Sequence, residues 1–152
     1  MSNRRAVRET VLKSLYAYVQ SDESISEVIE HVYKLTKIDK TDDYKFGERL
    51  LLKTVEMRDE ADEVIVKFLK NWELKRLALI DRLILEMGIT EMIVFPEIPT
   101  KVTINECIEI AKQYSTGGSG KFINGILDSA LEHLTKENKI KKSGRGLIEE
   151  SV

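Results

Sequence analysis

The sequence has little of what disulfide, metal or membrane chemistry requires. Its 152 residues include a single cysteine, Cys107, and only two histidines. One cysteine excludes an internal disulfide, and these three residues lie too far apart along the chain to match the spacing of a metal site. No apolar run approaches the roughly 18 residues of a membrane span, and no hydrophobic segment follows the N-terminal arginines. We therefore expect a cytoplasmic protein with no metal, no cofactor and no membrane contact.

Helix breakers and a dominant charge are also scarce. The chain has eight glycines and two prolines, which cluster, and a formal net charge of −2. No stretch alternates apolar and polar residues as a half-buried strand would. Overall charge gives no argument for nucleic-acid binding, which would have to depend on local charge. What is present, 42% hydrophobic and 33% charged residues, is typical of a helix-rich globular protein.

Apolar residues recur three and four positions apart along most of the chain, which predicts amphipathic helices. We expect about seven helices in one compact all-α domain. Polar breaks divide it into an N-terminal helical half, about 1–57, and a C-terminal helical half, about 60–138, and residues 139–152 form a loose tail. The most apolar stretch, 72–94, is apolar on most sides and is predicted to be a central helix.

Two segments fit the capping box, in which a serine or threonine and a glutamate three residues later bond each other's backbone amides. Ser24 and Glu27 fit it at the start of one helix. Thr103 and Glu106 fit it at the start of another, which we expect to end at Tyr114.

The pair Asn124 and Gly125 ordinarily indicates a turn, but here it falls inside an unbroken helical pattern. We expect the helix to continue through it. A glycine inside a helix costs up to about 1 kcal/mol relative to alanine. We therefore expect Gly125 to pack closely against the backbone of another helix.

A loop of small residues, 115–120, is followed directly by a cation and an aromatic ring, Lys121 and Phe122. Phosphate attraction and base stacking require this combination, so the pair is a candidate RNA-binding site. The alternative is that Lys121 is a solvated residue at a helix start and Phe122 belongs to the core.

The other candidate cations open the chain at Arg4, Arg5 and Arg8. Positive charge at a helix N-terminus opposes the helix dipole, so three arginines there are unfavourable for the helix itself. Such a cluster suggests a binding function, and arginine is well suited to bind phosphate. The alternative is an incidental solvated cluster. Tyr16 and Tyr18 lie two apart on the same predicted helix, so one of them should be a surface aromatic.

Three segments, taken together, resemble the NusB family of bacterial transcription antitermination proteins. They are RRAVRETVLKSLYAY at 4–18, WELKRLALIDRLILEMGITEM at 72–92 and PTKVTINECIEIAKQYSTGGSGKFINGILD at 99–128. The resemblance extends from about residue 3 to about residue 134. It implies an all-helical protein of two small bundles that binds the boxA segment of nascent RNA together with NusE, a ribosomal protein. It also implies a place in the RNA polymerase antitermination complex with other Nus factors, chiefly on ribosomal RNA operons.

The resemblance also implies roles for individual residues. Asp81 matches an acidic position at the NusE contact, whereas Gly118 stands where some relatives have an acidic residue. Phe68 transfers less securely, because its segment needs an adjustment of about one residue, and from the residues alone it could face either the core or a groove. The implied RNA-binding residues are Arg4, Arg5, Arg8, Tyr16, Phe68, Lys121 and Phe122.

The sequence also bears on two other classes of protein. The first is a helical protein–protein adaptor without RNA contact, in which Arg5 and Lys121 would not matter for the retention of RNA. An enzyme is not expected: Glu106 and Glu109 form a carboxylate pair, but capping and solvation explain them. NusB-like domains also occur fused to ribosomal RNA methyltransferases, but this sequence has no glycine-rich strand–loop–helix for a methyl donor. A homodimer that hides the arginines is neither favoured nor excluded by the sequence.

Overall fold

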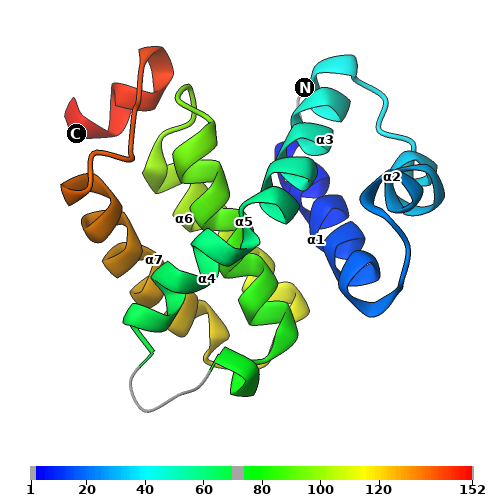
Figure 1. The fold of residues 1–152 in the computed structure, drawn as a ribbon. Coiled ribbons are helices and arrows are strands. Elements are labelled where there is room, and N and C mark those ends of the chain that lie inside the picture. The colour runs from blue at the N-terminus through cyan, green and yellow to red at the C-terminus, as the bar shows by residue number, and fades with distance from the viewer. Residues whose placement is uncertain (1–2, 70–73, 152) are drawn as a thin grey trace. The chain divides into compact units, whose positions relative to one another are not determined.

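A computed structural model describes residues 3–69 and 74–151, and of residues 148–151 it describes the backbone alone. In this part of the chain the secondary structure consists of seven α-helices and four short π or 3₁₀ segments, without a strand (Figure 1). The all-helical fold predicted from the sequence is confirmed. The chain divides into two compact units, Met1–Glu56 and Met57–Val152.

The first unit is built on two long helices that pack against each other. Its α-helices are α1 (Arg4–Gln20), α2 (Ile25–Val28) and α3 (Thr41–Glu56), and a π-helical turn, η1 (Ile29–Tyr33), and a 3₁₀ turn, η2 (Lys34–Thr36), follow α2. The core of this unit consists of Val7, Val11, Leu12, Leu15, Val28, Tyr33, Phe46, Leu50 and Leu51. The side chain of Asn3 caps α1 by accepting a hydrogen bond from the Ala6 amide. The capping box of Ser24 and Glu27 is present as predicted.

The second unit surrounds one apolar helix. Its elements are α4 (Arg58–Lys67), η3 (Leu74–Arg76), α5 (Leu79–Val94), α6 (Thr100–Tyr114), α7 (Ser119–Lys136) and η4 (Gly144–Ser151). Helix α5 packs against α4, α6 and α7, so the predicted central helix is confirmed over Leu79–Val94. A Cβ on Gly88 would stand 3.0 Å from the Cys107 Sγ and 3.3 Å from the Leu127 methyls, so the glycine allows α6 and α7 to approach α5.

The predicted capping box of Thr103 and Glu106 is wrong, because α6 begins three residues earlier, at Thr100. Pro99 precedes it, and proline suits a helix start because it lacks the N–H that the first turn leaves unbonded. Thr103 is instead buried inside α6, where its hydroxyl donates a hydrogen bond to the Glu91 carboxylate of α5. The same sequence pattern therefore serves helix–helix packing here.

Helix α7 continues through Asn124 and Gly125 as predicted. The expectation that Gly125 packs against another helix is wrong. Around the position of an added Cβ, apart from the residue's neighbours and the backbone of its own helix, no atom of the described residues lies within 4 Å. Gly125 is exposed, so the cost of this glycine is not explained by packing.

The residues that follow α7 are joined to the connector between α5 and α6. The Ser143 amide donates a hydrogen bond of 3.0 Å to the Pro96 carbonyl, and the Lys142 ammonium donates one of 2.8 Å to the Phe95 carbonyl. Within the range expected to form a loose tail, η4 then covers Gly144–Ser151.

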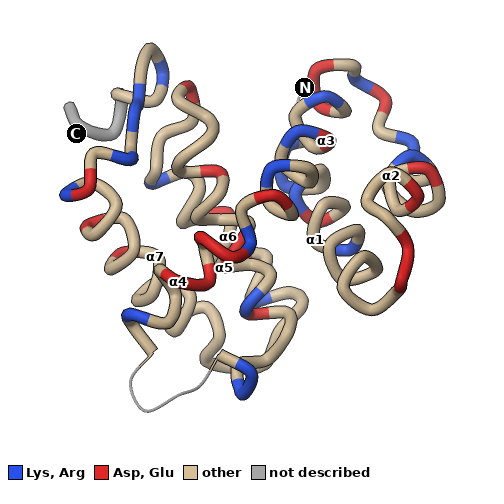
Figure 2. Tube along the Cα trace, in the orientation of Figure 1, with Lys and Arg blue, Asp and Glu red and all other residues tan. Residues whose placement is uncertain are grey.

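None of the helices within the described residues has the length and apolar character needed to cross a membrane. Lys and Arg are interspersed with Asp and Glu over most elements (Figure 2), in keeping with the small net charge of −2. Any electrostatic attraction for a ligand is therefore local.

Candidate nucleic-acid interface

In the second unit, the end of α4 and the first half of α7 enclose an open hollow of about 330 Å³. The structure brings together here three of the predicted RNA-binding residues, Phe68, Lys121 and Phe122, from two segments that are distant in sequence. Lys121 is exposed, and both phenylalanines are half-buried. The full lining is Phe68, Leu69, Lys121, Phe122, Gly125, Ile126 and Ser129.

The two aromatic rings differ in how they are held. The Phe68 ring meets the imidazole of His133 edge-on, with 6.1 Å between ring centroids and 70° between planes. It therefore rests against α7, and Phe68 lines the hollow as a half-buried residue. Phe122 borders a second hollow of about 330 Å³ as well, whose other lining residues are Leu69, Arg76, Leu77, Ala78 and Asp81. The first fully buried residue of α7 after it is Ile123, so Phe122 lies at the edge of the core.

Side-chain hydrogen bonds fix the loop of small residues that precedes α7. The Asp81 carboxylate, in the first turn of α5, accepts a hydrogen bond of 2.7 Å from the Ser115 hydroxyl and one of 3.2 Å from the Ser119 hydroxyl. The two serine hydroxyl oxygens, each of which donates its one hydrogen to the carboxylate, lie 2.9 Å apart. These contacts set the start of α7 and hence the direction in which Lys121 and Phe122 leave the helix.

Gly118 has a backbone reason to be glycine. It occupies the N-cap position of α7 with φ +89°, in the left-handed region where a side chain is strained. An acidic residue at this position would have to adopt that conformation. The way this loop turns therefore favours glycine at position 118.

Asp81 was predicted to contact a protein partner. Its side chain points into its own unit, is 7% exposed as a residue, and uses both carboxylate oxygens on Ser115 and Ser119. The partner contact of Asp81 stays a prediction, and its placement makes it an anchor of the loop.

A buried ion-pair cluster connects α4 to α5 in the second unit. Glu86 on α5 is fully buried and accepts hydrogen bonds from Arg58 Nε at 2.8 Å and from Arg82 Nε at 3.2 Å. Arg82 also pairs with Asp62 of α4 at 2.7 Å. Burial, reinforced by the nearby Asp62, raises the pKa of Glu86 to about 7 even though Arg58 acts to lower it. The cluster attaches the helix that leads to Phe68.

In the first unit, the three N-terminal arginines are not equivalent. Arg4 Nε lies 2.9 Å from Asp43 Oδ1, and its guanidinium stands 4.2 Å from the centroid of the Phe46 ring. Arg8 is 3% exposed and stands 5.2 Å from the same centroid. Arg5 is exposed. The spacing of four residues places Arg4 and Arg8 on one face of α1, and that face packs on Phe46. Arg5 is the arginine presented to solvent.

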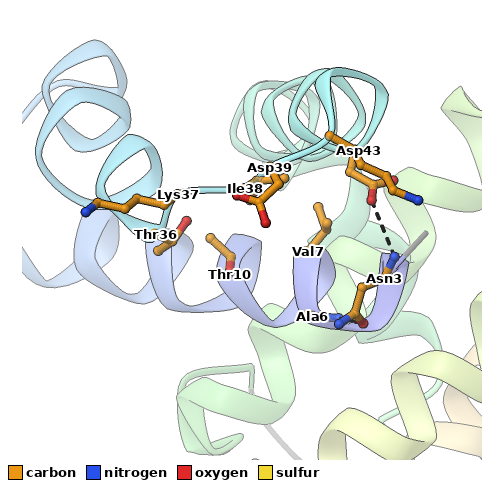
Figure 3. Close-up of a pocket in the computed structure, with 10 residues that line it drawn as sticks. Asn3, Ala6, Val7, Thr10, Thr36, Lys37, Ile38, Asp39 and Asp43 are labelled. Atoms are coloured by element: carbon orange, nitrogen blue, oxygen red, sulfur yellow. Dashed lines mark hydrogen bonds between the residues drawn. The ribbon is translucent and has the colours of Figure 1, made fainter. Parts of the chain in front are cut away.

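A groove of about 260 Å³ lies beside the arginine end of α1 (Figure 3). At this groove the backbone amide of Asn3 donates a hydrogen bond of 3.4 Å to the Asp43 carboxylate. Its lining mixes the cations Lys37 and Lys40 with the anions Asp39 and Asp43, so it does not favour a ligand of one charge. Further along α1, Tyr16 is 42% exposed. This confirms the prediction that one of Tyr16 and Tyr18 is a surface aromatic.

Four residues that line the hollow were not among the predicted RNA-binding residues: Leu69, Gly125, Ile126 and Ser129. Ser129 gave no signal. Gly125 gave a signal, because it is a helix breaker inside an unbroken helical pattern, but that signal predicts packing against another helix and not a place in the hollow.

Cationic and aromatic groups around an open hollow suit binding rather than catalysis. Within residues 3–69 and 74–147, no group of three or more His, Cys, Asp or Glu is placed to hold a metal ion. The fold and this surface define a small all-helical binding protein.

Comparisons with known proteins identify the family. The model of the NusB family matches residues 5–132. The transcription antitermination protein NusB of Salinibacter ruber is 43% identical over 148 residues, which cover 97% of this chain and 92% of that protein. The chain therefore belongs to the NusB family. Because this is a family of transcription antitermination factors, the expectation that the protein is not an enzyme is confirmed.

Solved structures agree. A structure of T. maritima NusB matches with a TM-score of 0.77 and 35% identity, and the match covers 90% of this chain and 96% of that chain. A crystal structure of the antitermination factors NusB and NusE in complex with dsRNA matches with a TM-score of 0.76 and 25% identity, over 86% of this chain and 96% of that chain.

Proposed function

We propose that this protein binds boxA-containing RNA together with NusE and acts through that complex in transcription antitermination, chiefly on ribosomal RNA operons. Membership of the NusB family supports the antitermination role. The similar structure of NusB and NusE with dsRNA supports RNA and NusE as partners. The observation that carries the proposal is the convergence of Phe68, Lys121 and Phe122 on one hollow.

The chemistry of the hollow suggests a division of roles. The exposed ammonium of Lys121 contacts a phosphate, which contributes affinity without base preference. The half-buried ring of Phe122 offers a face on which an unpaired base stacks, and Phe68 borders the same space. In the first unit, Arg5 is the arginine best placed for a phosphate, and Tyr16 is an exposed aromatic that a base can contact.

A partner protein fits the electrostatics of the chain. With a net charge of −2 and few cations at the site, the protein alone should bind RNA modestly and with strong salt dependence. A second RNA-binding surface supplied by NusE raises affinity by making the second contact intramolecular. We further propose that the complex joins RNA polymerase with other Nus factors in the cytoplasm, and that a homodimer, where it forms, competes with RNA for the arginines.

The test is binding of a fluorescent boxA RNA, measured by anisotropy, to this protein, to NusE and to the two together. We expect the mixture to bind far more tightly than either protein alone, and a scrambled boxA to lose this gain. Equal binding by the mixture and the single proteins, or no effect of scrambling, would overturn the proposal. Unchanged binding after both Arg5→Ala and Lys121→Ala would instead indicate an adaptor that does not touch RNA.

A further inference from the structure

Gly125 is an exposed glycine in the interior of a regular helix. It lies near the middle of α7, which runs from Ser119 to Lys136 without interruption. Glycine is the least favourable helix residue after proline, because its backbone loses the most conformational freedom on folding. A position that breaks this rule needs a compensating reason.

Neither of the usual structural reasons applies to Gly125. Among the described residues, the glycines with positive φ are Gly118 and Gly144, so the backbone of Gly125 accepts any L-residue. A Cβ placed there meets no described atom within 4 Å outside the adjacent residues and the local helix backbone. Gly88 in α5 makes the contrast clear, because there a Cβ would press on Cys107 and Leu127.

Gly125 lines the hollow together with Phe122 and Ser129. Phe122 and Lys121 precede it by three and four residues and Ser129 follows it by four, so all four lie on one face of α7. The hollow, of about 330 Å³, is at the lower end of the roughly 300–1,000 Å³ of small-ligand pockets and has room for one flat ring.

We propose that Gly125 is a contact residue for RNA. In the absence of a side chain, a nucleobase stacked on Phe122 reaches van der Waals contact with the backbone of α7. The inference rests on the proposed RNA-binding function and adds to it a position that determines how deeply the base enters. The cation at Lys121 supplies the charge complementarity for the phosphate of the same nucleotide.

The proposal makes stability and binding move in opposite directions. Gly125→Ala should raise the thermal midpoint of the free protein, because alanine favours the helix and the space is open. The same variant, with NusE, should bind boxA RNA roughly fivefold or more weakly, because the methyl group lifts the base from the ring. Gly125→Gln, which is larger and uncharged, should lose more, approaching the effect of Phe122→Ala.

The matched control is Asn124→Ala, at the preceding exposed position, which does not line the hollow. It also gains helix propensity without changing charge, and it should bind boxA RNA as the wild type does. Wild-type affinity for Gly125→Ala beside a defective Phe122→Ala would overturn the inference and leave the proposed function standing. A lowered thermal midpoint for Gly125→Ala would overturn it too, by indicating a packing role. Absence of boxA binding by the wild-type protein with NusE would overturn both.

Discussion

Asp81 in the first turn of α5 accepts a hydrogen bond of 2.7 Å from the hydroxyl of Ser115, the C-cap residue of α6. A second hydrogen bond, from Ser119, reaches the other oxygen of the same carboxylate. One nearly buried acid thus fixes both ends of the loop that precedes Lys121 and Phe122. The end of α7 that carries Lys121 and Phe122 depends on a residue that does not itself line the hollow beside Gly125.

This arrangement predicts that Asp81→Ala loosens the loop. Two hydroxyls lose their acceptor in a nearly buried place, which should lower the free energy of unfolding by about 1–3 kcal/mol. The urea midpoint measures this loss, and hydrogen exchange should speed up at the amides of 116–120 before it does elsewhere in α7. Ser115→Ala removes one of the two hydrogen bonds and should cost less. Unchanged exchange in 116–120 for Asp81→Ala would contradict the anchoring role.

Arg5 and Arg8 should respond differently to substitution. Arg5→Ala should weaken boxA RNA binding and reduce the slope of log affinity against log salt by about 0.7–1, because one phosphate contact is lost. Arg8→Ala should instead destabilise the first unit by about 1–3 kcal/mol, since its side chain is buried on the ring of Phe46. Salt titrations of binding and urea unfolding of each variant check both statements. A loss of stability for Arg5→Ala without a change in slope would reverse the assignment.

Phe122→Ala should weaken boxA RNA binding by roughly 1–3 kcal/mol, the cost of one lost base–aromatic stack. Because the ring is half-buried at the edge of the core, some loss of stability accompanies it. Phe122→Leu separates the two effects, since it keeps most of the apolar contact and removes the flat ring. We expect Phe122→Leu to fold normally and to bind weakly, measured by calorimetry and anisotropy; wild-type binding would assign the ring to the core alone.

Glu86 should make stability depend on pH. Burial raises its pKa from the ordinary value of 4.5 to about 7 in the folded protein. Between these two values the folded state keeps the proton that the unfolded state releases, so the free energy of unfolding falls as pH rises through this window, by about 1.4 kcal/mol for each pKa unit at most. Below the window both states are protonated, and above it the contribution of this group is constant.

Urea unfolding at pH values from 4 to 8 measures this dependence, and Glu86→Gln, which keeps one acceptor oxygen for the arginines, is the control. The variant should have a shallower decline between pH 4.5 and 7 than the wild type. Identical curves for the two proteins would mean that the two arginines hold Glu86 ionised throughout.

Most of the helices could be predicted from the sequence, because amphipathic spacing is a local property. The apolar stripes of α1 and α7, the capping box of Ser24 and Glu27 and the all-round apolarity of α5 required no knowledge of neighbours. The candidate site was also marked in the sequence, since Lys121 and Phe122 follow a loop of small residues. The resemblance to the NusB family added Phe68, although nothing local decided which way it faced.

Tertiary structure decided what each of these residues contacts. The sequence pattern at Thr103 fits a cap, and only the packing of α6 on α5 directs its hydroxyl to Glu91. Arg4 and Arg8 share a face by spacing, but the ring of Phe46 on α3 decides that this face is covered. Gly125 is a helix breaker in the sequence, which predicts that it packs against another helix. The structure instead leaves its position open beside Phe122, with no described atom within 4 Å of an added Cβ outside its neighbours and its own helix backbone. The reason is the same in each case: periodicity and caps depend on residues a few positions apart, whereas burial and partners depend on chain segments that the sequence does not place next to one another.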